Sequence, residues 1–571
     1  MKHPYFEFIS KSKKIAFFSI LFFGTLMSLK AQYVSGHKSE FIRPNFLSIV
    51  LGRPTDTSIT ASVLFDSTED YYLEWGTASN SYPYQTVTYT NTVNVPDEVY
   101  MTNLVADTKY YYRLAHRPHG GGGFITTPEY TFHTQRSVNS TFVFDVEADE
   151  HLYDYGNSNL YKVTSQNEAS ANPDFLISLG DIYGDDHTPT TTSTSGQIDS
   201  LRLYYRSLLG NICNSVPFYF ANGNHDCEKD KWLNDGPPNS IGVWSTIWRN
   251  YYYPNPAPNG FYTGNDSVEG FSMGLPHDYY AWTWGNAQFI VLDEYRYDNY
   301  IGDTTAKPTD WEWTLGRKQY DWLQTTLQNS TSKFKFVFSH HIRGEDRGGA
   351  ICAPLFEWGG YEDTTLSSYT FPTNRPGWPM PIEDLFKKYG VQIYFQGHDH
   401  LFAHEVYDSV IIQEVPMAAD STYIKGITAN GAAYTADTLN GSGHIRVTVN
   451  SSCVTVQYIS SYLPKDTSTN NQHNNAVRFS YTIGNCASAV PTIQTIDEQI
   501  IVYPDPASQY VKVRLPDNFK YNYITLKNTM GQTILQTKLN TIDVSEIPNG
   551  IYFITVTTEN NTYNKKVVIN H

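Results

Sequence analysis

The sequence predicts a multidomain protein: an N-terminal β-sandwich, a central layered α/β domain and a small C-terminal β-sandwich. Three observations support this. The chain has 571 residues, which is too long for one hydrophobic core. Aromatic residues make up 15% of it and charged residues only 17%, a composition typical of folded, strand-rich extracytoplasmic proteins. Apolar β-rich runs alternate with amphipathic helical stretches only in the middle of the chain.

Residues 1–31 have the features of a secretory signal peptide. A lysine-rich stretch, residues 11–14, precedes an apolar run from Ile15 to Leu26, and Ala31 offers a small residue at the cut. The run is short for a membrane span, and a retained anchor is the alternative. No later segment is long and apolar enough to cross a membrane. We therefore expect a mature chain without a transmembrane span, exported through the periplasm and secreted or held at the cell surface.

Charge and cysteine content exclude some partners and sites. The formal net charge is −17, so the bulk surface repels nucleic acid, although metal ions can reverse the field at a local phosphate site. The five cysteines include no CxxC pair, so a thiolate zinc site is not supported. One or two disulfides are possible after export. A Cys453–Cys486 bond would close the end of the central region, but the spacing leaves the connectivity open.

Residues 33–136 are predicted to form short strands separated by turn residues. Examples are Ser58–Phe65, Tyr71–Trp75 and Tyr110–Ala115. The segment from Leu104 to Arg113 resembles the tyrosine-corner strand of fibronectin type III domains. We therefore expect a fibronectin type III-like β-sandwich over residues 33–136.

Residues 137–486 are predicted to form the α/β domain. Helices are expected at Gln197–Leu209 and Gly316–Leu327, where apolar residues share one face. The central strands are expected at Thr141–Val146, Phe175–Leu179, Val216–Phe220, Phe289–Leu292, Phe334–Phe338 and Val391–Phe395. Two further β-rich segments follow, Ile445–Val449 and Val454–Ile459.

Short polar clusters come directly after five of these strands. They are Asp149-Glu150-His151, Gly180-Asp181, Gly223-Asn224-His225-Asp226, His340-His341 and Gly397-His398-Asp399-His400. Open α/β sheets bind ligands at the carboxyl ends of their strands. We therefore expect all five clusters to converge on one edge of one sheet. Imidazole, carboxylate and amide ligands suit divalent transition metals such as Zn, Mn or Fe.

Taken in order, these motifs resemble those of the calcineurin-like metallophosphoesterase superfamily. The pattern is DxH, GD, GNH(D/E), a histidine after a strand, and GHxH. The resemblance implies an α/β/β/α four-layer domain that holds two divalent metal ions. It implies one ion on Asp149, His151, Asp181 and His400, and the other on Asp181, Asn224, His340 and His398. Asp181 would bridge the pair, and a metal-bridging hydroxide would attack phosphorus.

The same resemblance implies roles for the neighbouring residues. His225 would face the substrate and stabilise the phosphoryl charge or protonate the leaving oxygen, and Asp226 would orient His225. The family pattern favours His340 over His341 as the ligand, although Ile342 stands where a proline is common. Arg343 and Arg347 follow this cluster and are candidates for binding the substrate phosphate, with a surface salt bridge as the alternative.

Residues 487–571 form a third predicted unit, a small β-sandwich. Its segments Val502–Ala507, Met530-Gly531-Gln532 and Asn549–Tyr552 resemble the C-terminal sorting domain of the type IX secretion system of Bacteroidetes. That resemblance implies the type IX machinery as a partner. It indicates where the protein is delivered and says nothing about its reaction. An ordinary accessory β-domain is the alternative.

The motifs together predict a secreted metallophosphoesterase that hydrolyses phosphate esters. Our first expectation is an acid phosphatase-like phosphomonoesterase. The alternatives are a phosphodiesterase or nucleotidase, because pocket loops choose the substrate, and a surface binding protein with an inactive phosphoesterase domain. All ligand positions are filled, which argues against an inactive domain.

The predicted domain order resembles that of purple acid phosphatases, but two motifs differ. Those enzymes begin with DxG, whereas His151 stands at the third position here. They also carry GDxxY, whose Tyr binds ferric iron, whereas Tyr183 comes one position early and Gly184 occupies the ligand position. A one-residue shift turns a side chain to the opposite face of an extended segment. We therefore expect a colourless enzyme.

Overall fold

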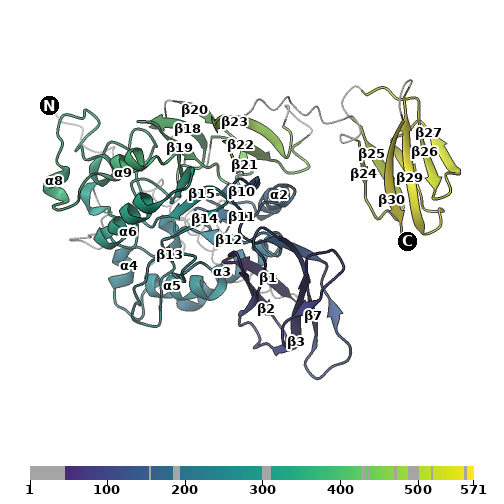
Figure 1. Cartoon of the computed structure of the whole chain (residues 1–571), viewed down its shortest axis with the longest axis horizontal. Coiled ribbons are helices and arrows are strands. Elements are labelled where there is room, and N and C mark those ends of the chain that lie inside the picture. Colours follow the sequence, from purple (N-terminus) through teal and green to yellow (C-terminus); the bar gives the residue numbers. More distant parts are fainter. Residues whose placement is uncertain are drawn as a thin grey trace, which may run out of the picture. The chain divides into compact units, whose positions relative to one another are not determined.

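The architecture comes from a computed structural model, which describes residues 46–152, 156–183, 193–298, 310–425, 433–434, 436–467, 472–486, 500–515, 519–558 and 562–571. The predicted signal peptide lies outside these residues. The chain divides into two compact units, Met1–Asn485 and Cys486–His571 (Figure 1). Within the described part, none of the helices has the length and apolar character needed to span a bilayer.

The first unit begins with a β-sandwich. One sheet has the order β1 (Leu47–Gly52), β2 (Ser58–Phe65), β6 (Asp97–Thr102). The facing sheet contains β4 (Tyr84–Gln85), β3 (Glu69–Gly76), β7 (Lys109–Pro118) and β8 (Ile125–Thr126), with β5 (Tyr89–Thr90) beside β3 and β9 (Tyr130–His133) beside β7. Alternate residues of both sheets, among them Val63, Tyr71 and Tyr112, fill the core. The Val105 amide donates to the Tyr110 hydroxyl at 2.9 Å, as a tyrosine corner requires.

Two further sheets pack face to face in the centre of this unit. The first sheet has the order β12 (Phe218–Phe220), β11 (Phe175–Ser178), β10 (Phe142–Glu147), β21 (Ser442–Val449), β22 (Cys453–Ser461), β23 (Ala476–Gly484). The second sheet has the order β13 (Thr263–Gly264), β14 (Tyr280–Trp284), β15 (Ala287–Val291), β16 (Phe334–Phe338), β17 (Ile393–Gln396), β19 (Val410–Glu414), β18 (Phe402–Tyr407), β20 (Asp437–Leu439). Aromatic rings fill the space between them, and Phe144 meets Phe289 edge to face at 5.1 Å.

Helices cover the outer face of each sheet. Tyr161 of α2 (Ser158–Ala169) and Tyr205 of α3 (Ser195–Leu209) pack in one core cluster with Leu176 of the first sheet. On the other side, α6 (Gly316–Asn329) and α9 (Ile382–Tyr389) pack in a second cluster with Ile290 and Val337 of the second sheet. The four-layer α/β/β/α arrangement predicted from the sequence is thereby confirmed (Figure 1).

The remaining helical segments are mostly short. They are η1 (Asn224–Asp226), α4 (Asp230–Asn234), α5 (Ile241–Tyr252), η2 (Asp310–Glu312), α7 (Phe356–Gly359) and α8 (Phe371–Asn374). The longest, α5, starts where the Ser240 hydroxyl accepts from the Val243 amide at 3.4 Å.

The distribution of the strands corrects one expectation. The motif-bearing strands do not lie in one sheet, because β10, β11 and β12 belong to the first sheet and β16 and β17 to the second. The clusters still meet, because the two sheets pack face to face and the chain leaves both at the same edge. The Gly397 amide donates to the His340 carbonyl at 2.8 Å, and the His398 amide donates to Asp149 Oδ2, also at 2.8 Å.

Helix α3 holds the central domain to the N-terminal sandwich. It starts with a capping box, in which the Thr194 amide donates to Gln197 Oε1 at 2.7 Å. Two arginines, Arg202 and Arg206, lie among the apolar residues of its buried face. Arg206 donates to the Ser62 hydroxyl at 3.0 Å and to the Ser62 carbonyl at 2.8 Å. The helix therefore reaches β2 of the sandwich through a fully buried guanidinium.

The second unit is a small β-sandwich, as predicted. Strands β24 (Ile501–Tyr503), β25 (Tyr510–Arg514) and β28 (Thr541–Asp543) form one sheet. Strands β27 (Thr533–Thr537), β26 (Tyr523–Asn528), β29 (Gly550–Thr557) and β30 (Thr562–Ile569) form the other.

Cys453 and Cys486 are disulfide-bonded, whereas Cys213, Cys227 and Cys352 are free and buried.

Candidate metal centre

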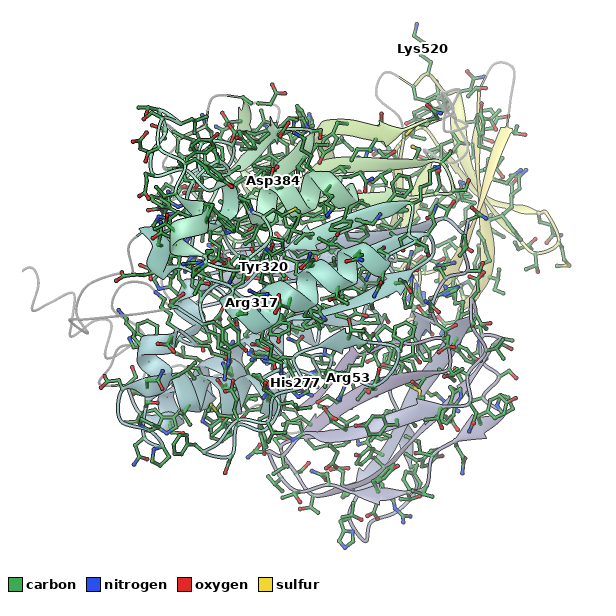
Figure 2. All side chains as sticks on the ribbon, turned by 60° about the vertical axis from the view of Figure 1, so that its left-hand side comes forward. Arg53, His277, Arg317, Tyr320, Asp384 and Lys520 are labelled. Carbon is green, nitrogen blue, oxygen red and sulfur yellow. The ribbon has the colours of Figure 1, made fainter. Side chains whose placement is uncertain are left out.

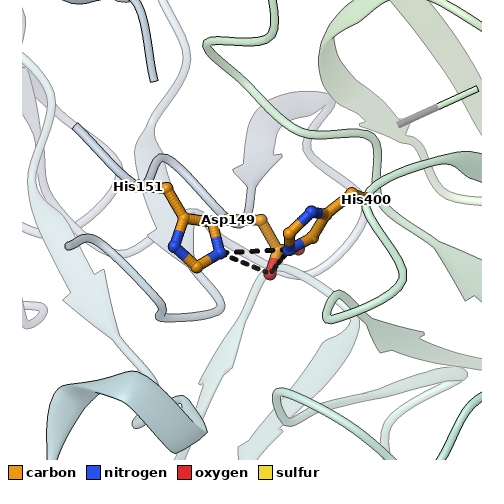
Figure 3. A group of neighbouring side chains, drawn as sticks. All are labelled: Asp149, His151 and His400. Atoms are coloured by element: carbon orange, nitrogen blue, oxygen red, sulfur yellow. Dashed lines mark hydrogen bonds and ion pairs between the residues drawn. The ribbon is translucent and has the colours of Figure 1, made fainter. Parts of the chain in front are cut away.

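One group of possible metal ligands comes from the ends of β10 and β17. Potential ligand atoms of Asp149, His151 and His400 all lie within 4.8 Å of one another, and all three residues are buried. Figure 3 shows the three side chains turned toward a common point. His151 Nε2 is 3.0 Å from His400 Nε2, and Asp149 Oδ1 is 3.5 Å from His400 Nε2. Two imidazole nitrogens and a carboxylate oxygen at this spacing suit a divalent transition metal.

A second group comes from the ends of β11, β16 and β17. It contains Asp181, His340 and His398, again buried and again with ligand atoms within 4.8 Å of one another. His340 Nε2 is 3.1 Å from Asp181 Oδ2. Its other ring nitrogen, Nδ1, lies 2.9 Å from the Leu179 carbonyl, to which it donates. That hydrogen bond turns the Nε2 lone pair toward Asp181.

The two groups adjoin. Asp181 Oδ2 of the second group is 3.8 Å from His151 Nε2 of the first. Asp149 Oδ1 of the first group is 3.8 Å from His340 Nε2 of the second. The two carboxylates therefore lie at the boundary between the groups, where a bridging ligand would stand.

In each group, some of the potential metal-ligand atoms have no hydrogen-bond partner among the described residues. The buried atoms in this condition include Asp149 Oδ1, Asp181 Oδ2, Asn224 Oδ1, His340 Nε2 and His398 Nε2. A buried polar atom without a partner is costly, and four of these five atoms belong to the two ligand groups. Such a donor set fits two divalent cations.

Backbone amides hold the outer oxygens of both carboxylates. Asp149 Oδ2 accepts from the His398 amide at 2.8 Å, and Asp181 Oδ1 accepts from the His225 amide at 2.7 Å. In each case the second oxygen is the one without a hydrogen-bond partner. The loops thus fix which oxygen of each carboxylate is turned toward the centre.

The backbone at this edge is strained. The φ angle is +54° at Asp149, +40° at His151, +57° at Asp181, +76° at His398 and +58° at His400. Left-handed backbone is uncommon for residues with a side chain, and each such residue costs on the order of 1 kcal/mol or more. Backbone strain that is concentrated on residues with converging metal-ligand atoms is typical of a functional site.

The electrostatic state of these side chains favours cations. Burial raises the pKa of Asp181, but His340 and His225 outweigh it and hold that pKa well below its usual range. Burial, together with His400, lowers the pKa of His151 to about 3. Burial also holds the pKa of His398 well below its usual range. Ionised carboxylates and neutral imidazoles are the forms that bind metal.

His340 differs from the other histidines. Burial opposes its protonation, but Asp181 and Asp149 raise its pKa to about 10. Since Nδ1 already donates to Leu179, this shift shows that the two carboxylates favour a positive charge at Nε2. A bound metal ion would supply that charge.

His225 lies at the rim of the centre. Its ring is 5.4 Å from the His151 ring, and the side chain is less buried than those of the two ligand groups. Its backbone belongs to η1, whose N–H group holds Asp181. The imidazole therefore stands beside the candidate metal ligands.

Asp226, which we expect to orient His225, contacts the loop that carries Asp181. Its Oδ2 accepts from the Asp181 and Gly223 amides, both at 2.8 Å, and its Oδ1 accepts from Arg202 at 3.3 Å. Burial raises the pKa of Asp226 to about 6, against the effect of Arg202. The described contacts of this carboxylate thus fix the loop that carries Asp181.

Sequence reasoning missed Arg202. Its guanidinium is fully buried and also lies 4.8 Å from the centre of the Tyr183 ring. Tyr183 belongs to the core cluster between α3 and the first sheet. A signal for Arg202 was present in the sequence, because its spacing from Ile198 and Tyr205 places an arginine on the apolar face of the predicted helix.

The two histidines of the His340-His341 pair have different surroundings. His340 belongs to the second ligand group. His341 Nδ1 accepts from the Arg343 amide at 3.1 Å, and its Nε2 donates to the Gly348 carbonyl at 3.0 Å. Both ring nitrogens of His341 are thus engaged in shaping the loop.

The two arginines proposed for substrate have structural contacts. Arg343 forms an ion pair with Asp346 at 2.5 Å and stacks on the Phe356 ring at 4.2 Å. Arg347 donates to the carbonyl of His398 and to Asp399 Oδ1 at 3.2 Å. Arg347 therefore supports the loop that carries His398 and His400.

Comparisons with known proteins agree with this geometry. Residues 143–402 match the family model of the calcineurin-like phosphoesterases, and residues 501–570 match the secretion system C-terminal sorting domain. No protein with a curated description is similar enough in sequence to match the chain.

Two solved structures share the fold. The purple acid phosphatase PPD1 from yellow lupin (Lupinus luteus) seeds is 16% identical, with a TM-score of 0.52 over 78% of this chain and 75% of that one. A structure of PhoD is 17% identical, with a TM-score of 0.53 over 77% of this chain and 92% of that one. At these identities the likeness establishes the fold alone.

Proposed function

We propose that this chain, which carries a calcineurin-like phosphoesterase domain, hydrolyses phosphomonoesters at a centre of two divalent metal ions. The family match confirms the predicted enzyme class, a hydrolase of phosphoric ester bonds. The observation that supports two ions is the pair of adjoining buried ligand groups, each of which includes ligand atoms without a hydrogen-bond partner among the described residues.

The site residues would divide between the two ions as follows. Asp149, His151 and His400 would hold one ion, and Asn224, His340 and His398 the other, with Asp181 between them. Two such ions, when bound, clamp phosphoryl oxygens and lower the pKa of a water molecule. The identity of the ions stays a proposal among Zn, Mn and Fe, since nitrogen and oxygen donors suit all three.

His225 is proposed to act on the substrate rather than on the metal. Its position at the rim, beside His151, lets the imidazole approach the leaving-group oxygen of a bound ester. An imidazole there can donate a proton to that oxygen or stabilise charge on the phosphoryl group. Asp226 would act through the loop, because it holds the amides of Gly223 and Asp181.

We propose a phosphomonoester as the substrate for two reasons. The chain shares its fold with a purple acid phosphatase, and it has an N-terminal β-sandwich. The first motif differs, since His151 brings an imidazole to the centre. Tyr183 is buried under Arg202, which supports a centre without a phenolate ligand.

The match to the sorting domain confirms the predicted localisation. The chain is exported by type IX secretion, to the cell surface or to the outside. The boundaries at residues 31, 136 and 486 remain predictions. We propose that the sorting domain contributes nothing to catalysis, since both ligand groups lie in residues 149–400.

Metal content and turnover test the proposal together. The mature chain, loaded in turn with Zn, Mn and Fe, would be analysed for bound metal and assayed with p-nitrophenyl phosphate and bis(p-nitrophenyl) phosphate. We expect about two ions per chain and preferential hydrolysis of the monoester. Asp181→Asn and His398→Ala should lose metal and most turnover.

The matched control is His404→Ala. This residue is a histidine of β18 whose ring packs on Tyr481 at 4.3 Å, outside both ligand groups. It should keep both metal and turnover. Full turnover in Asp181→Asn, or a folded wild-type chain that takes up no transition metal, would contradict the two-ion proposal. Faster hydrolysis of the diester would contradict the monoester assignment alone.

A further inference from the structure

A cavity opens on the helix side of the second sheet, away from the candidate metal centre. Its volume is about 360 Å³, which is within the range of small-molecule sites, roughly 300–1,000 Å³. None of its residues belongs to either ligand group. It is lined by Gly359, Tyr361, Tyr369, Glu383, Asp384, Tyr407 and Asp408.

The lining combines three carboxyl groups with three phenol rings. Asp384 stands in the first turn of α9, and Figure 2 shows it on the helix layer that also carries Tyr320 and Arg317. Tyr361 and Tyr369 meet edge to face, with ring centres 5.2 Å apart. Their planes therefore form two differently oriented walls. Rings set at an angle beside carboxylates are the arrangement that proteins use for organic cations.

Glu383 is the residue that most clearly lacks a partner. Its residue exposure is 5%, and its Oε1 has no hydrogen-bond partner among the described residues. Burial, Asp408 and Asp384 raise its pKa to about 8. A buried carboxyl group that lines a cavity and has no donor to satisfy it is costly in the empty site.

The nearby lysine does not remove this excess of negative charge. Lys387, one turn further along α9, pairs with Asp408. No described lysine or arginine forms an ion pair with Glu383 or Asp384. The cavity therefore has more carboxylates than cations, in a wall that is partly aromatic.

We propose that this cavity binds an alkylammonium group, with Glu383 as its counter-ion and the rings of Tyr361, Tyr369 and Tyr407 around its carbon atoms. A bare metal ion fits less well, because these carboxylates do not come close enough to form a ligand group of three. The ammonium could belong to a free amine or to a lysine side chain of a polypeptide, which share this chemistry.

Calorimetric titration of the full mature chain tests the proposal. The probes are n-butylamine, choline, Nα-acetyl-lysine methylamide and the neutral choline analogue 3,3-dimethylbutan-1-ol. We expect at least one ammonium probe to bind and the neutral analogue to bind more weakly. Tighter binding of the lysine derivative than of n-butylamine and choline would identify a polypeptide as the source, and the reverse order a free ammonium compound.

Three variants locate the binding. Above pH 8, where Glu383 is ionised, Glu383→Gln should weaken binding of the ammonium probe by about tenfold or more, because it removes the negative charge with little change of shape. Tyr407→Leu should weaken it by a smaller factor through loss of a ring face. The control Asp321→Asn removes one negative charge from an exposed ion pair on α6 and should change nothing.

Some outcomes would overturn the proposal. They are the absence of binding by all three ammonium probes, binding of the neutral analogue as tightly as choline, and an equal loss of ammonium affinity in Asp321→Asn and Glu383→Gln. Calcium binding without ammonium binding would replace the proposed ligand by a metal ion. Melting curves and phosphatase turnover of each variant establish that it is folded, and Tyr407→Leu provides a second reading should Glu383→Gln fail to fold.

Discussion

Replacing Gly223 by alanine tests whether the position of Asp181 decides metal binding. Gly223 has an extended backbone, with φ −100° and ψ 173°, so an added methyl group causes no backbone strain there. It would, however, stand 2.2 Å from Asp181 Oδ1 and 2.5 Å from the Asp181 amide nitrogen. The substitution therefore acts on the carboxylate by contact alone.

The displacement can be worked from these distances. Ordinary van der Waals contact begins at 3.4 Å, so the 2.2 Å contact must open by about 1.2 Å. Metal ligands tolerate errors of only about 0.2 Å in distance, and a misplacement of 1 Å in an active site can cost roughly 10²-fold in rate. We expect Gly223→Ala to lose at least half of its bound metal and to turn over p-nitrophenyl phosphate roughly 10²-fold more slowly.

The control carries the same substitution where there is room. A methyl group at Gly196, in the first turn of α3, meets no atom within 4 Å. Gly196→Ala should keep full activity and gain about 0.5–1 kcal/mol of stability. A folded Gly223→Ala chain with the metal content and turnover of the wild type would refute the reasoning. Gly397→Ala, whose methyl group would meet Asp149 Oδ2 at 2.6 Å, repeats the test on the other carboxylate.

Four further predictions follow from the described contacts. His225→Ala should keep its metal content while turnover falls by about 10²–10⁴-fold; loss of metal would make His225 a ligand. The metal-loaded protein should show no tyrosinate-to-iron band in visible absorption, and Tyr183→Phe should leave its spectrum unchanged; a band lost in that variant would return Tyr183 to the centre. A chain that ends at residue 486 keeps Cys486 and should retain wild-type turnover in vitro; inactivity of this folded chain would give the sorting domain a part in catalysis. Burial raises the pKa of Glu228, but Arg249 and Arg296 outweigh it and lower that pKa from 4.5 to about 2. The ionised Glu228 side chain therefore stabilises the fold above pH 4.5, and this stabilisation is lost as the pH falls toward 2. Glu228→Gln should therefore lower the free energy of unfolding by about 3–5 kcal/mol at pH 7 and by much less near pH 2; an equal loss at both pH values would argue against a charge effect.

The sequence predicted elements and motifs well because both are local signals. The run Phe334–Phe338 is a strand with the same bounds in the structure, and the helix expected at Gln197–Leu209 begins only two residues earlier. Hydrophobic period and capping residues determine such segments. The candidate ligands were found for a similar reason, since each cluster directly follows its strand.

The pairing of strands could not be read in this way. Strand β10 lies between β11, which follows it closely, and β21, almost 300 residues later. Nothing in the composition of β10 distinguishes a place in the first sheet from one in the second, so one shared sheet was the simpler and wrong prediction. The contact between Asp226 and Arg202 was missed similarly, because Arg202 lies on a helix whose packing depends on the whole fold.

The two buried arginines of α3 connect two parts of the chain that sequence analysis treats as separate domains. Arg202 bonds the Asp226 carboxylate, which holds the Asp181 loop, and Arg206, one turn later, bonds Ser62 in the sandwich. Excising the sandwich would expose Arg206 and loosen the helix that also anchors the metal loop. Amide hydrogen exchange should therefore find β2, α3 and the Asp181 loop opening as one cooperative element. Recombination that exchanged the sandwich for another would have to preserve this contact to keep the enzyme intact.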